Sequence, residues 1–356
     1  MEQPGFPEPI ISTYWMESAP EQTSLPADAS PSKTTRIFVF AGRILVAAVA
    51  LYFVLRLVSL DQIAHALERA SVPYILAGTA LLLLNIATRV IKWRSMLHIV
   101  KDDSSWWESF TSIMLGITLG SFTPVQLGEL GGRSIRVNHS KRSHVVGLTL
   151  VDRSQVFLVV AMAGTFSYAF FLTDSTMLAV LAGSVSAAII LYAYFRLDLV
   201  KSIVDRIHLR ILRHRWIEDV IETFTFIGKE HFLSTLMYSL VWLAIVTLQM
   251  YLILNAFVSI SLWHVFLGFS AMMFFKSIVN ISISDIGIRE ASTIYFFSLF
   301  GVSDAAALSA SVVMFVINII IPSLIGVLFI PKFRRAGTIV NGTTTSTSNN
   351  SASTLH

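Results

Sequence analysis

The chain has 356 residues, of which 54% are hydrophobic and only 13% are charged, and its mean hydropathy is +0.69. Soluble domains carry about 25% charged residues, whereas apolar runs of about 20 residues recur along this chain. These features indicate an all-α, polytopic integral membrane protein. The absence of Cys from the sequence excludes disulfides, thiol catalysis and Cys-ligated metals. The formal net charge of +4 comes from basic residues beside the apolar runs, a pattern typical of cytoplasmic loops rather than of nucleic-acid binding.

The two ends of the chain are polar. Residues 1–35 contain six of the ten prolines and several acidic residues, without the basic start and apolar core of a signal peptide. Residues 333–356 are rich in Ser, Thr and Asn. We expect both segments to be disordered cytoplasmic tails that flank one transmembrane domain, residues 36–332.

Six apolar runs are long enough to cross a bilayer as helices. We predict these full spans at 37–56, 72–91, 145–172, 176–195, 232–257 and 306–330. Two further apolar stretches, 107–140 and 262–300, are interrupted by polar residues at 121–130 (SFTPVQLGEL) and 282–290 (SISDIGIRE). Ionisable residues at membrane depth are costly and indicate a functional site. Interrupted segments at matching places in two halves are typical of the binding site of a transporter.

The distribution of Lys and Arg predicts how these two stretches lie in the membrane, because short cytoplasmic loops are enriched in basic residues. The loop 196–231 is strongly basic, whereas the turns near 173–175 and 258–263 contain no Lys or Arg. The stretch 107–140 has basic residues on both sides, so we expect a re-entrant hairpin from the cytoplasm. The stretch 262–300 follows an external turn and precedes a span that ends beside basic residues, so we expect a hairpin from the outside. The basic residues around the first stretch are Arg89, Lys92, Arg94, Lys101, Lys141 and Arg142.

The two hairpins give the chain an inverted-topology repeat. Repeat one, about 37–173, and repeat two, about 174–332, each contain two spans, a hairpin and a further span, in opposite orientations. The predicted fold therefore has about six full spans plus two re-entrant helical hairpins, and both termini are cytoplasmic.

In the first interrupted segment, the sequence predicts a helix start. Thr123 is the expected cap, Pro124 takes the first helical position and Gln126 completes a capping box. We expect a half-helix from about 124 to 138. A helix that begins in mid-membrane points unpaired N–H groups and its positive dipole end at the bilayer centre, where an anion binds favourably. One face of this helix carries three charged side chains, those of Glu129, Arg133 and Arg136.

In the second interrupted segment, Ser284 or Asp285 is the expected cap of another half-helix, and Gly287 permits a sharp bend. Asp285 and Arg289 have the i, i+4 spacing of a helical ion pair, and Glu290 follows directly. The two interrupted segments thus carry the same kinds of residue.

The span 145–172 adds two adjacent charges, Asp152 and Arg153. If both hairpins and this span converge near the midplane, their charges form one site, and Glu129 and Glu290 approach one another there. The alternative is that the ion pairs only hold the bundle together, because an unpaired charge in a bilayer is costly and pairing is expected in either case. A bundle needs no such concentration of charge for stability, which favours a site.

These motifs resemble those of a known family, the transmembrane flippase domain of lysylphosphatidylglycerol synthases and the stand-alone flippase-like membrane proteins related to it. The resemblance covers about 40–332. Its landmarks are a Pro-x-x-x-Gly-Glu motif followed by Arg, an acidic–Arg pair in the next span and a Gly-x-Arg/Lys-Glu-Ala motif. This chain matches them with Pro124, Gly128, Glu129 and Arg133, with Asp152 and Arg153, and with Gly287, Arg289, Glu290 and Ala291.

The resemblance implies movement of an amphiphile, an anionic phospholipid or a lipid-linked (glyco)phosphate, across the cytoplasmic membrane of a prokaryote. The headgroup would pass between the hairpin tips while the acyl or prenyl chains stay in lipid. We expect Arg133, Arg136, Arg153 and Arg289 to neutralise a phosphate. We expect Glu129, Asp152 and Glu290 to hold those arginines, engage an amine or sugar, or relay protons. A membrane lipid is the expected substrate, with no catalytic residue, cofactor or metal. The aminoacyl-transferase domain of the synthases is absent from this sequence, so no synthase activity is expected.

Two other functions fit parts of the pattern. A membrane glycosyl- or phosphotransferase would need a catalytic base or metal site at one membrane face, and Asp102 and Asp103 lack companion ligands for such a site. A non-transporting partner subunit of an envelope lipid or glycan pathway would co-purify with envelope-biosynthesis enzymes and retain no lipid.

Overall fold

A computed structural model of the protein describes residues 70–123, 126–137, 141–173, 175–195, 227–279 and 287–330, and the single residues 68, 220, 223 and 285. The chain divides into two units, 1–48 and 49–356, and every described residue belongs to the second. The predicted span 37–56, both predicted tails and the predicted helix start at Pro124 lie outside the described residues.

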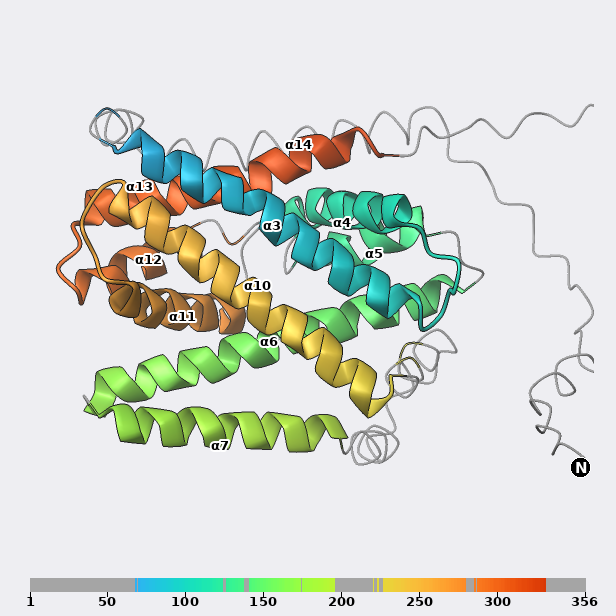
Figure 1. The fold of residues 1–356 in the computed structure, drawn as a ribbon, viewed down its shortest axis with the longest axis horizontal. Helices are drawn as coiled ribbons and strands as arrows, with labels where there is room; N and C mark the ends of the chain where they lie inside the picture. The colour runs from blue at the N-terminus through green and yellow to red at the C-terminus, as the bar shows by residue number, and fades with distance from the viewer. Residues whose placement is uncertain are drawn as a thin grey trace, which may run out of the picture. The chain divides into compact units, whose positions relative to one another are not determined.

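The described residues form helices joined by turns and contain no strand (Figure 1). In chain order the helices are α3 (Val72–Leu97), α4 (Trp106–Ser121), α5 (Gly128–Arg136), α6 (Arg142–Thr173), α7 (Thr176–Phe195), α10 (Lys229–Asn255), α11 (Leu262–Ile278), α12 (Ile288–Ser298), α13 (Asp304–Phe315), the π-helix η2 (Val316–Ile320) and α14 (Ile321–Val327).

Among the residues that the structure describes, four helical stretches are long and apolar enough to cross a membrane. They are α3, α6, α10 and the continuous helix made of α13, η2 and α14, and they confirm the spans predicted at 72–91, 145–172, 232–257 and 306–330. Helix α7 coincides with the predicted span 176–195. The protein is therefore a polytopic all-α membrane protein, as its composition predicts.

Serine caps begin three of the helices. The hydroxyls of Ser105, Ser261 and Ser303 each accept a hydrogen bond from the backbone N–H three residues later, at the starts of α4, α11 and α13. Such caps satisfy one of the N–H groups that the first turn of a helix leaves unpaired. They fix where the shorter helices begin next to the connecting turns.

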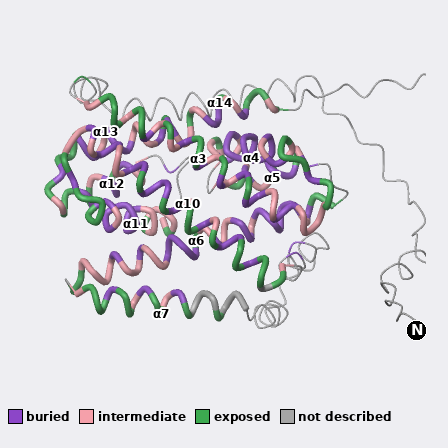
Figure 2. Tube along the Cα trace, viewed as in Figure 1, coloured by how far each residue is buried: buried purple, intermediate pink, exposed green. Residues whose placement is uncertain are grey.

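Helices α4 and α7 show opposite burial (Figure 2). Most of α4 is buried, including the side chains of Ser109, Thr111, Ser112 and Thr118, because α5, α14 and α3 surround it. In contrast, α7 packs on α6 and exposes large apolar side chains such as Met177 and Leu181. Exposed apolar side chains are expected where a helix faces lipid.

The first interrupted stretch folds as an antiparallel pair, α4 and α5. Gly132 of α5 lies against Leu115 of α4, and Glu129, one turn earlier in α5, lies against Gly120, one turn later in α4. The open end of this hairpin, where α4 begins, lies near the end of α3, because a short connection joins Leu97 to Trp106.

The second interrupted stretch folds as another antiparallel pair, α11 and α12. Gly268 in α11 contacts Phe297 near the end of α12, while Lys276 near the end of α11 reaches Asp285 just before α12. This pair opens beside the start of α3, where the N–H of Ser71 donates to the carbonyl of Ala256 at 2.9 Å. The two hairpins therefore enter the bundle from opposite ends of α3, as predicted (Figure 1).

The remaining long helices also run in opposite directions in pairs. Gln249 of α10 donates to the carbonyl of Gly78 at 2.9 Å, and Lys92 donates to Ser239 at 2.7 Å, so α3 and α10 are antiparallel. Helix α6 ends near α12, whereas α13 begins there and continues into α14 toward the start of α4. For the spans and hairpins that the structure describes, these directions are those expected in the predicted inverted repeat; its first span, 37–56, lies outside the described residues.

Candidate functional site: a charged cavity between the hairpin tips

A cavity of about 360 Å³ lies where the two hairpin tips meet. Side chains from α3, α4, α5, α6, α10, α11 and η2 line it, together with Gln126 and Asp285 before α5 and α12. Its charged lining residues are Arg89, Lys92, Glu129, Arg133, Asp152, Arg153, Lys276 and Asp285. Ionisable groups gathered inside a membrane bundle are characteristic of a functional site.

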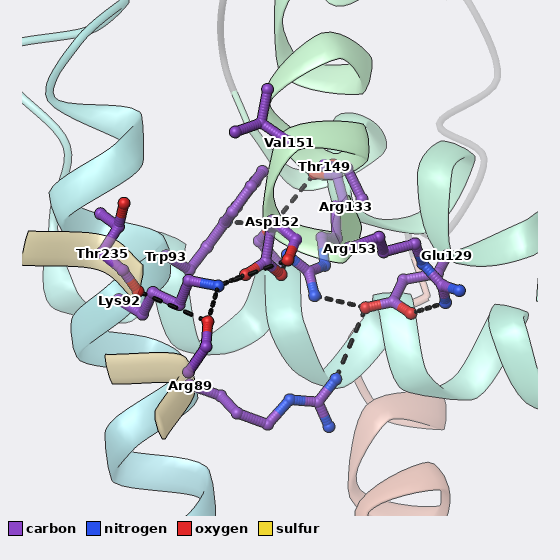
Figure 3. A network of polar contacts seen from close by, with 12 residues as sticks. Arg89, Lys92, Trp93, Glu129, Arg133, Thr149, Val151, Asp152, Arg153 and Thr235 are labelled. Carbon is purple, nitrogen blue, oxygen red and sulfur yellow. Dashed lines mark hydrogen bonds and ion pairs between the residues drawn. The ribbon is translucent and has the colours of Figure 1, made fainter. Parts of the chain in front are cut away.

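Arg133 lies at the centre of the charged cluster (Figure 3). Its Nη1 donates to Asp152 Oδ2 at 2.7 Å, and its Nη2 forms an ion pair with Glu129. The guanidinium lies over the ring of Trp93, 4.6 Å from the ring centroid, and Ser112 Oγ donates to the Arg133 carbonyl at 3.0 Å. Two carboxylates and an aromatic ring thus compensate a fully buried cation.

Lys92 joins the same cluster from α3. Its Nζ lies 2.5 Å from Asp152 Oδ1 and donates to Ser239 Oγ on α10 at 2.7 Å. Asp152 is therefore shared by two buried cations, Lys92 and Arg133 (Figure 3). This sharing links α3, α5 and α6 through one carboxylate, and the Lys92–Ser239 hydrogen bond adds α10.

Arg153 and Arg89 reach Glu129 from the more open side of the cluster. Arg153 Nη2 forms an ion pair with Glu129 Oε2 and donates to Gln126 Oε1 at 2.9 Å. Arg89 Nη2 lies 3.5 Å from Glu129 Oε1. Their side chains remain 29% and 27% exposed, whereas that of Arg133 is 2% exposed. These two guanidinium groups therefore present free donors to the cavity.

The tip of the second hairpin adds Lys276 and Asp285. Lys276 Nζ lies 2.8 Å from Asp285 Oδ2, and Gln126 Nε2 donates to the same oxygen at 3.3 Å. The other carboxylate oxygen, Asp285 Oδ1, is buried without a hydrogen-bond partner. The two hairpin tips thus meet at Gln126 and Asp285.

The start of α5 differs from the predicted one. The helix runs over Gly128–Arg136 rather than about 124–138, because Gln126 has a left-handed backbone (φ +54°) that a helix cannot include. The predicted cap Thr123 still acts at the helix start, since its hydroxyl accepts from the Gly128 N–H at 2.6 Å. Gly128 packs against the Leu119 carbonyl, where a Cβ has no room. The predicted site residue Arg136 is half-buried at the end of α5 and is not among the cavity-lining residues.

The start of α12 corrects a second prediction. Asp285 and Arg289 were expected to form an ion pair, but Asp285 has φ +58° and precedes the helix, so its carboxylate turns to Lys276. Arg289 instead pairs with Glu290 and lies over the Phe315 ring, 4.2 Å from its centroid. Glu290 also accepts from the Gly287 N–H at 2.7 Å, which caps the helix. Gly287 has φ +86°, a conformation that favours glycine.

The predicted charged site residues other than Arg136, together with Gly287, thus fall into two groups. Glu129, Arg133, Asp152, Arg153 and Asp285 line one cavity, whereas Gly287, Arg289 and Glu290 form the start of α12 and are not among its lining residues. Glu129 and Glu290 share no hydrogen-bond or ion-pair partner. Gln126 and Asp285 make the contact between the hairpins instead.

Three basic lining residues were not predicted as site residues. Arg89 and Lys92 count in the sequence only as basic residues that flank the first hairpin; α3 continues past the predicted end at residue 91 to Leu97, so Lys92 as well as Arg89 lies within the helix. Lys276 lies near the end of the apolar run 262–278. A single Lys in such a run is itself a signal for a functional site.

The fold and the cavity define a class: a multi-pass integral membrane protein with paired charges enclosed between opposed helical hairpins. The chain belongs to the family described as the lysylphosphatidylglycerol synthase TM region, whose model matches residues 40–326. No match to this chain was found among curated proteins. Family membership associates the protein with lipid-related functions in the membrane.

Proposed function

We propose that the protein is a lipid transporter that binds the anionic headgroup of a membrane lipid between its hairpin tips and moves it across the cytoplasmic membrane. The observation that carries this proposal is the cavity itself, where basic residues outnumber acidic ones at the meeting point of the hairpins. The headgroup is that of an anionic phospholipid or a lipid-linked (glyco)phosphate. Its hydrocarbon chains stay in the bilayer during transport.

The basic residues have different roles in this proposal. Arg89 and Arg153 present partly exposed guanidinium groups that bind the phosphate, because planar guanidinium groups bind phosphate oxygens in pairs. Arg133 is fully buried between Glu129 and Asp152, so it positions those carboxylates. The proposal is a binding and transport role, without a catalytic step.

The opposed hairpins support transport rather than static binding. Inverted repeats around a central site allow the site to open to either side of the membrane in turn. In this protein the hairpins enter from opposite ends of α3 and meet at Gln126 and Asp285. Movement of one hairpin tip away from the cavity would open it to one side of the membrane, and movement of the other tip would open it to the opposite side.

Reconstituted vesicles test the proposal. Purified protein is incorporated into liposomes with fluorescent phosphatidylglycerol or phosphatidic acid, and a membrane-impermeant quencher measures how fast inner-leaflet lipid reaches the outside. We expect Arg153→Gln to lower this rate more than tenfold, since a charge-assisted hydrogen bond contributes about 1.5–3 kcal/mol. Arg142→Gln is the matched control, because Arg142 is exposed and lies outside the cavity lining. Equal rates for empty and protein-containing vesicles would refute the proposal.

The orientation and cellular context belong to the same proposal. We place the protein in the inner membrane of a prokaryote, with both termini cytoplasmic and with envelope-biosynthesis enzymes as partners. Basic residues at the open end of the first hairpin, Lys101, Lys141 and Arg142, support a cytoplasmic position for that end. Because the chain has no native Cys, single cysteines at 142 and 262 can be labelled from one side of the membrane. Labelling of both from the same side would contradict this orientation.

A further inference from the structure

The charged lining of the cavity consists of an inner and an outer set. The inner set contains two carboxylates, Glu129 and Asp152, and the two least exposed cations, Arg133 and Lys92, whose side chains are 2% and 5% exposed. Lys92 and Arg133 both contact Asp152, and Arg133 also pairs with Glu129. The formal charges of the inner set therefore cancel.

The outer set is not balanced. Arg89, Arg153 and Lys276 are 27%, 29% and 20% exposed. Arg89 and Arg153 share Glu129 with Arg133 of the inner set, and Lys276 pairs with Asp285, the one further carboxylate among the described lining residues. Residues 124–125, 280–284 and 286, which the structure does not describe, contain no Asp, Glu, Lys or Arg. The described lining residues thus have two more positive than negative charges.

An uncompensated charge in a membrane interior is costly, so the guest that the cavity favours supplies the missing negative charge. We propose that the cavity selects a dianionic headgroup, a lipid that ends in a phosphate monoester, over the monoanion of a phosphodiester. This proposal rests on the proposed function, because it specifies the headgroup that the same cavity binds.

The positions of the donors fit a terminal phosphate. Arg89, Arg153 and Lys276 come from three different helices, α3, α6 and α11, and a phosphate monoester presents three oxygens that accept hydrogen bonds. A phosphodiester presents only two such oxygens. The volume of about 360 Å³ falls at the lower end of the range for ligand sites, about 300–1,000 Å³, which suits a compact headgroup. Selectivity for a dianion then follows from both charge and the number of acceptors.

Equilibrium binding to the purified full-length protein in detergent tests this selectivity. The probes are phosphatidic acid and a prenyl monophosphate as dianions, phosphatidylglycerol as a monoanion, and diacylglycerol as a neutral lipid. At pH 8 the terminal phosphates are dianionic, because their second ionisation has a pKa of about 6. We expect both dianions to bind at least about tenfold more tightly than phosphatidylglycerol, because their third phosphate oxygen accepts one more charge-assisted hydrogen bond from the cavity. A difference between the two dianions shows whether the acyl or the prenyl source is preferred.

Two substitutions change the charge excess in opposite directions. Lys276→Gln lowers it by one, and we expect the preference for phosphatidic acid over phosphatidylglycerol to fall to within about twofold. Asp285→Asn raises it by one, so binding of phosphatidic acid is retained or strengthened, whereas a purely structural role for Asp285 predicts a loss. Arg142→Gln is the control that leaves the preference unchanged, and thermal unfolding confirms that each variant is folded.

The outcomes separate this inference from the function on which it rests. Equal binding of phosphatidic acid and phosphatidylglycerol by the unaltered protein overturns dianion selectivity and leaves an anionic-lipid transporter. Binding of neither anion, or equal binding of diacylglycerol, overturns both. Weaker binding of phosphatidic acid by folded Asp285→Asn overturns the charge-excess explanation.

Discussion

Gln126 and Asp285 hydrogen-bond to one another across the two hairpin tips, and they are the two non-glycine residues of the described chain with positive φ. A left-handed conformation costs a non-glycine residue about 1–2 kcal/mol. Both strained turns therefore depend on the surrounding contacts, which include the Gln126–Asp285 bond and the Lys276–Asp285 ion pair. This is the contact that must break if the hairpin tips separate during transport.

A covalent link between the tips should stop transport. The chain contains no Cys, so Gln126→Cys combined with Asp285→Cys introduces a single possible cross-link. We expect a short bifunctional thiol reagent to join the two positions and to lower lipid translocation at least tenfold, because the linked tips cannot separate. The rate is measured in vesicles before and after treatment.

Each single cysteine variant serves as the control for modification alone. Treatment of these variants should leave their translocation rate within about twofold of the untreated rate. Full transport by the cross-linked double variant would show that the tips stay together throughout the cycle.

Loss of the Glu129 carboxylate should destabilise the protein. Glu129 is buried and contacts Arg89, Arg133 and Arg153, so Glu129→Gln leaves buried positive charge without its partner. Removing one member of a buried ion pair costs about 3–5 kcal/mol. We expect a clear drop in the thermal unfolding temperature of the purified protein. Glu230→Gln, at an exposed position in the first turn of α10, should change that temperature little. Similar shifts for both variants would contradict the central role of Glu129.

The hairpins were predictable from the sequence because the prediction depends on which loops contain basic residues and not on the exact ends of the helices. Basic residues on both sides of 107–140, and a turn without Lys or Arg before 262–300, predict that the two hairpins enter from opposite sides, and small errors in helix ends do not change that prediction. The membership of the site was less predictable. Arg89, at the end of the predicted span 72–91, and Lys92, just after it, serve in the sequence only as markers of the cytoplasmic side, whereas α3 continues to Leu97 and carries both into the cavity lining.

Local backbone conformation explains the remaining differences. Helical spacing predicts that Asp285 pairs with Arg289, but this holds only if both residues are in one helix. The positive φ of Asp285 directs its carboxylate to Lys276, nine residues earlier, and Arg289 pairs with its neighbour Glu290. The i, i+4 spacing of Asp285 and Arg289 does not reveal that the backbone turns at Asp285. A glycine at that position would have suggested a positive φ, but an Asp does not.

A chain of three amide side chains joins three helical segments beyond the cavity. Asn85 on α3 donates to Asn318 in η2 at 2.8 Å, and Asn318 donates to Gln249 on α10 at 3.0 Å. Asn318→Leu removes both bonds at similar volume. Hydrogen bonds between membrane helices contribute about 0.6 kcal/mol each on average, so we expect a loss of about 1 kcal/mol in the free energy of unfolding. The double variant Asn85→Leu/Asn318→Leu should lose less than the sum of the single losses, and strict additivity would show that the two amides do not interact.

Two adjacent glycines of α5 should respond in opposite ways to substitution by Ala. A Cβ on Gly132 would lie 2.8 Å from the Leu115 carbonyl oxygen and 2.9 Å from the Cα of Gly116, whereas a Cβ on Gly131 would meet nothing within 4 Å. Helix propensity favours Ala equally at both positions, by about 0.5–1 kcal/mol. We therefore expect Gly131→Ala to raise the unfolding temperature slightly.

Gly132→Ala should lower the unfolding temperature, because the backbone of α4 cannot give way as a flexible side chain would. It should also lower lipid translocation, since the same contact surface holds Glu129 and Arg133 against Gly116. Gly131→Ala, in the same helix turn, should transport lipid at the unaltered rate. If the two variants were equally stable and equally active, close packing of α4 on α5 would not be what positions the charged cluster.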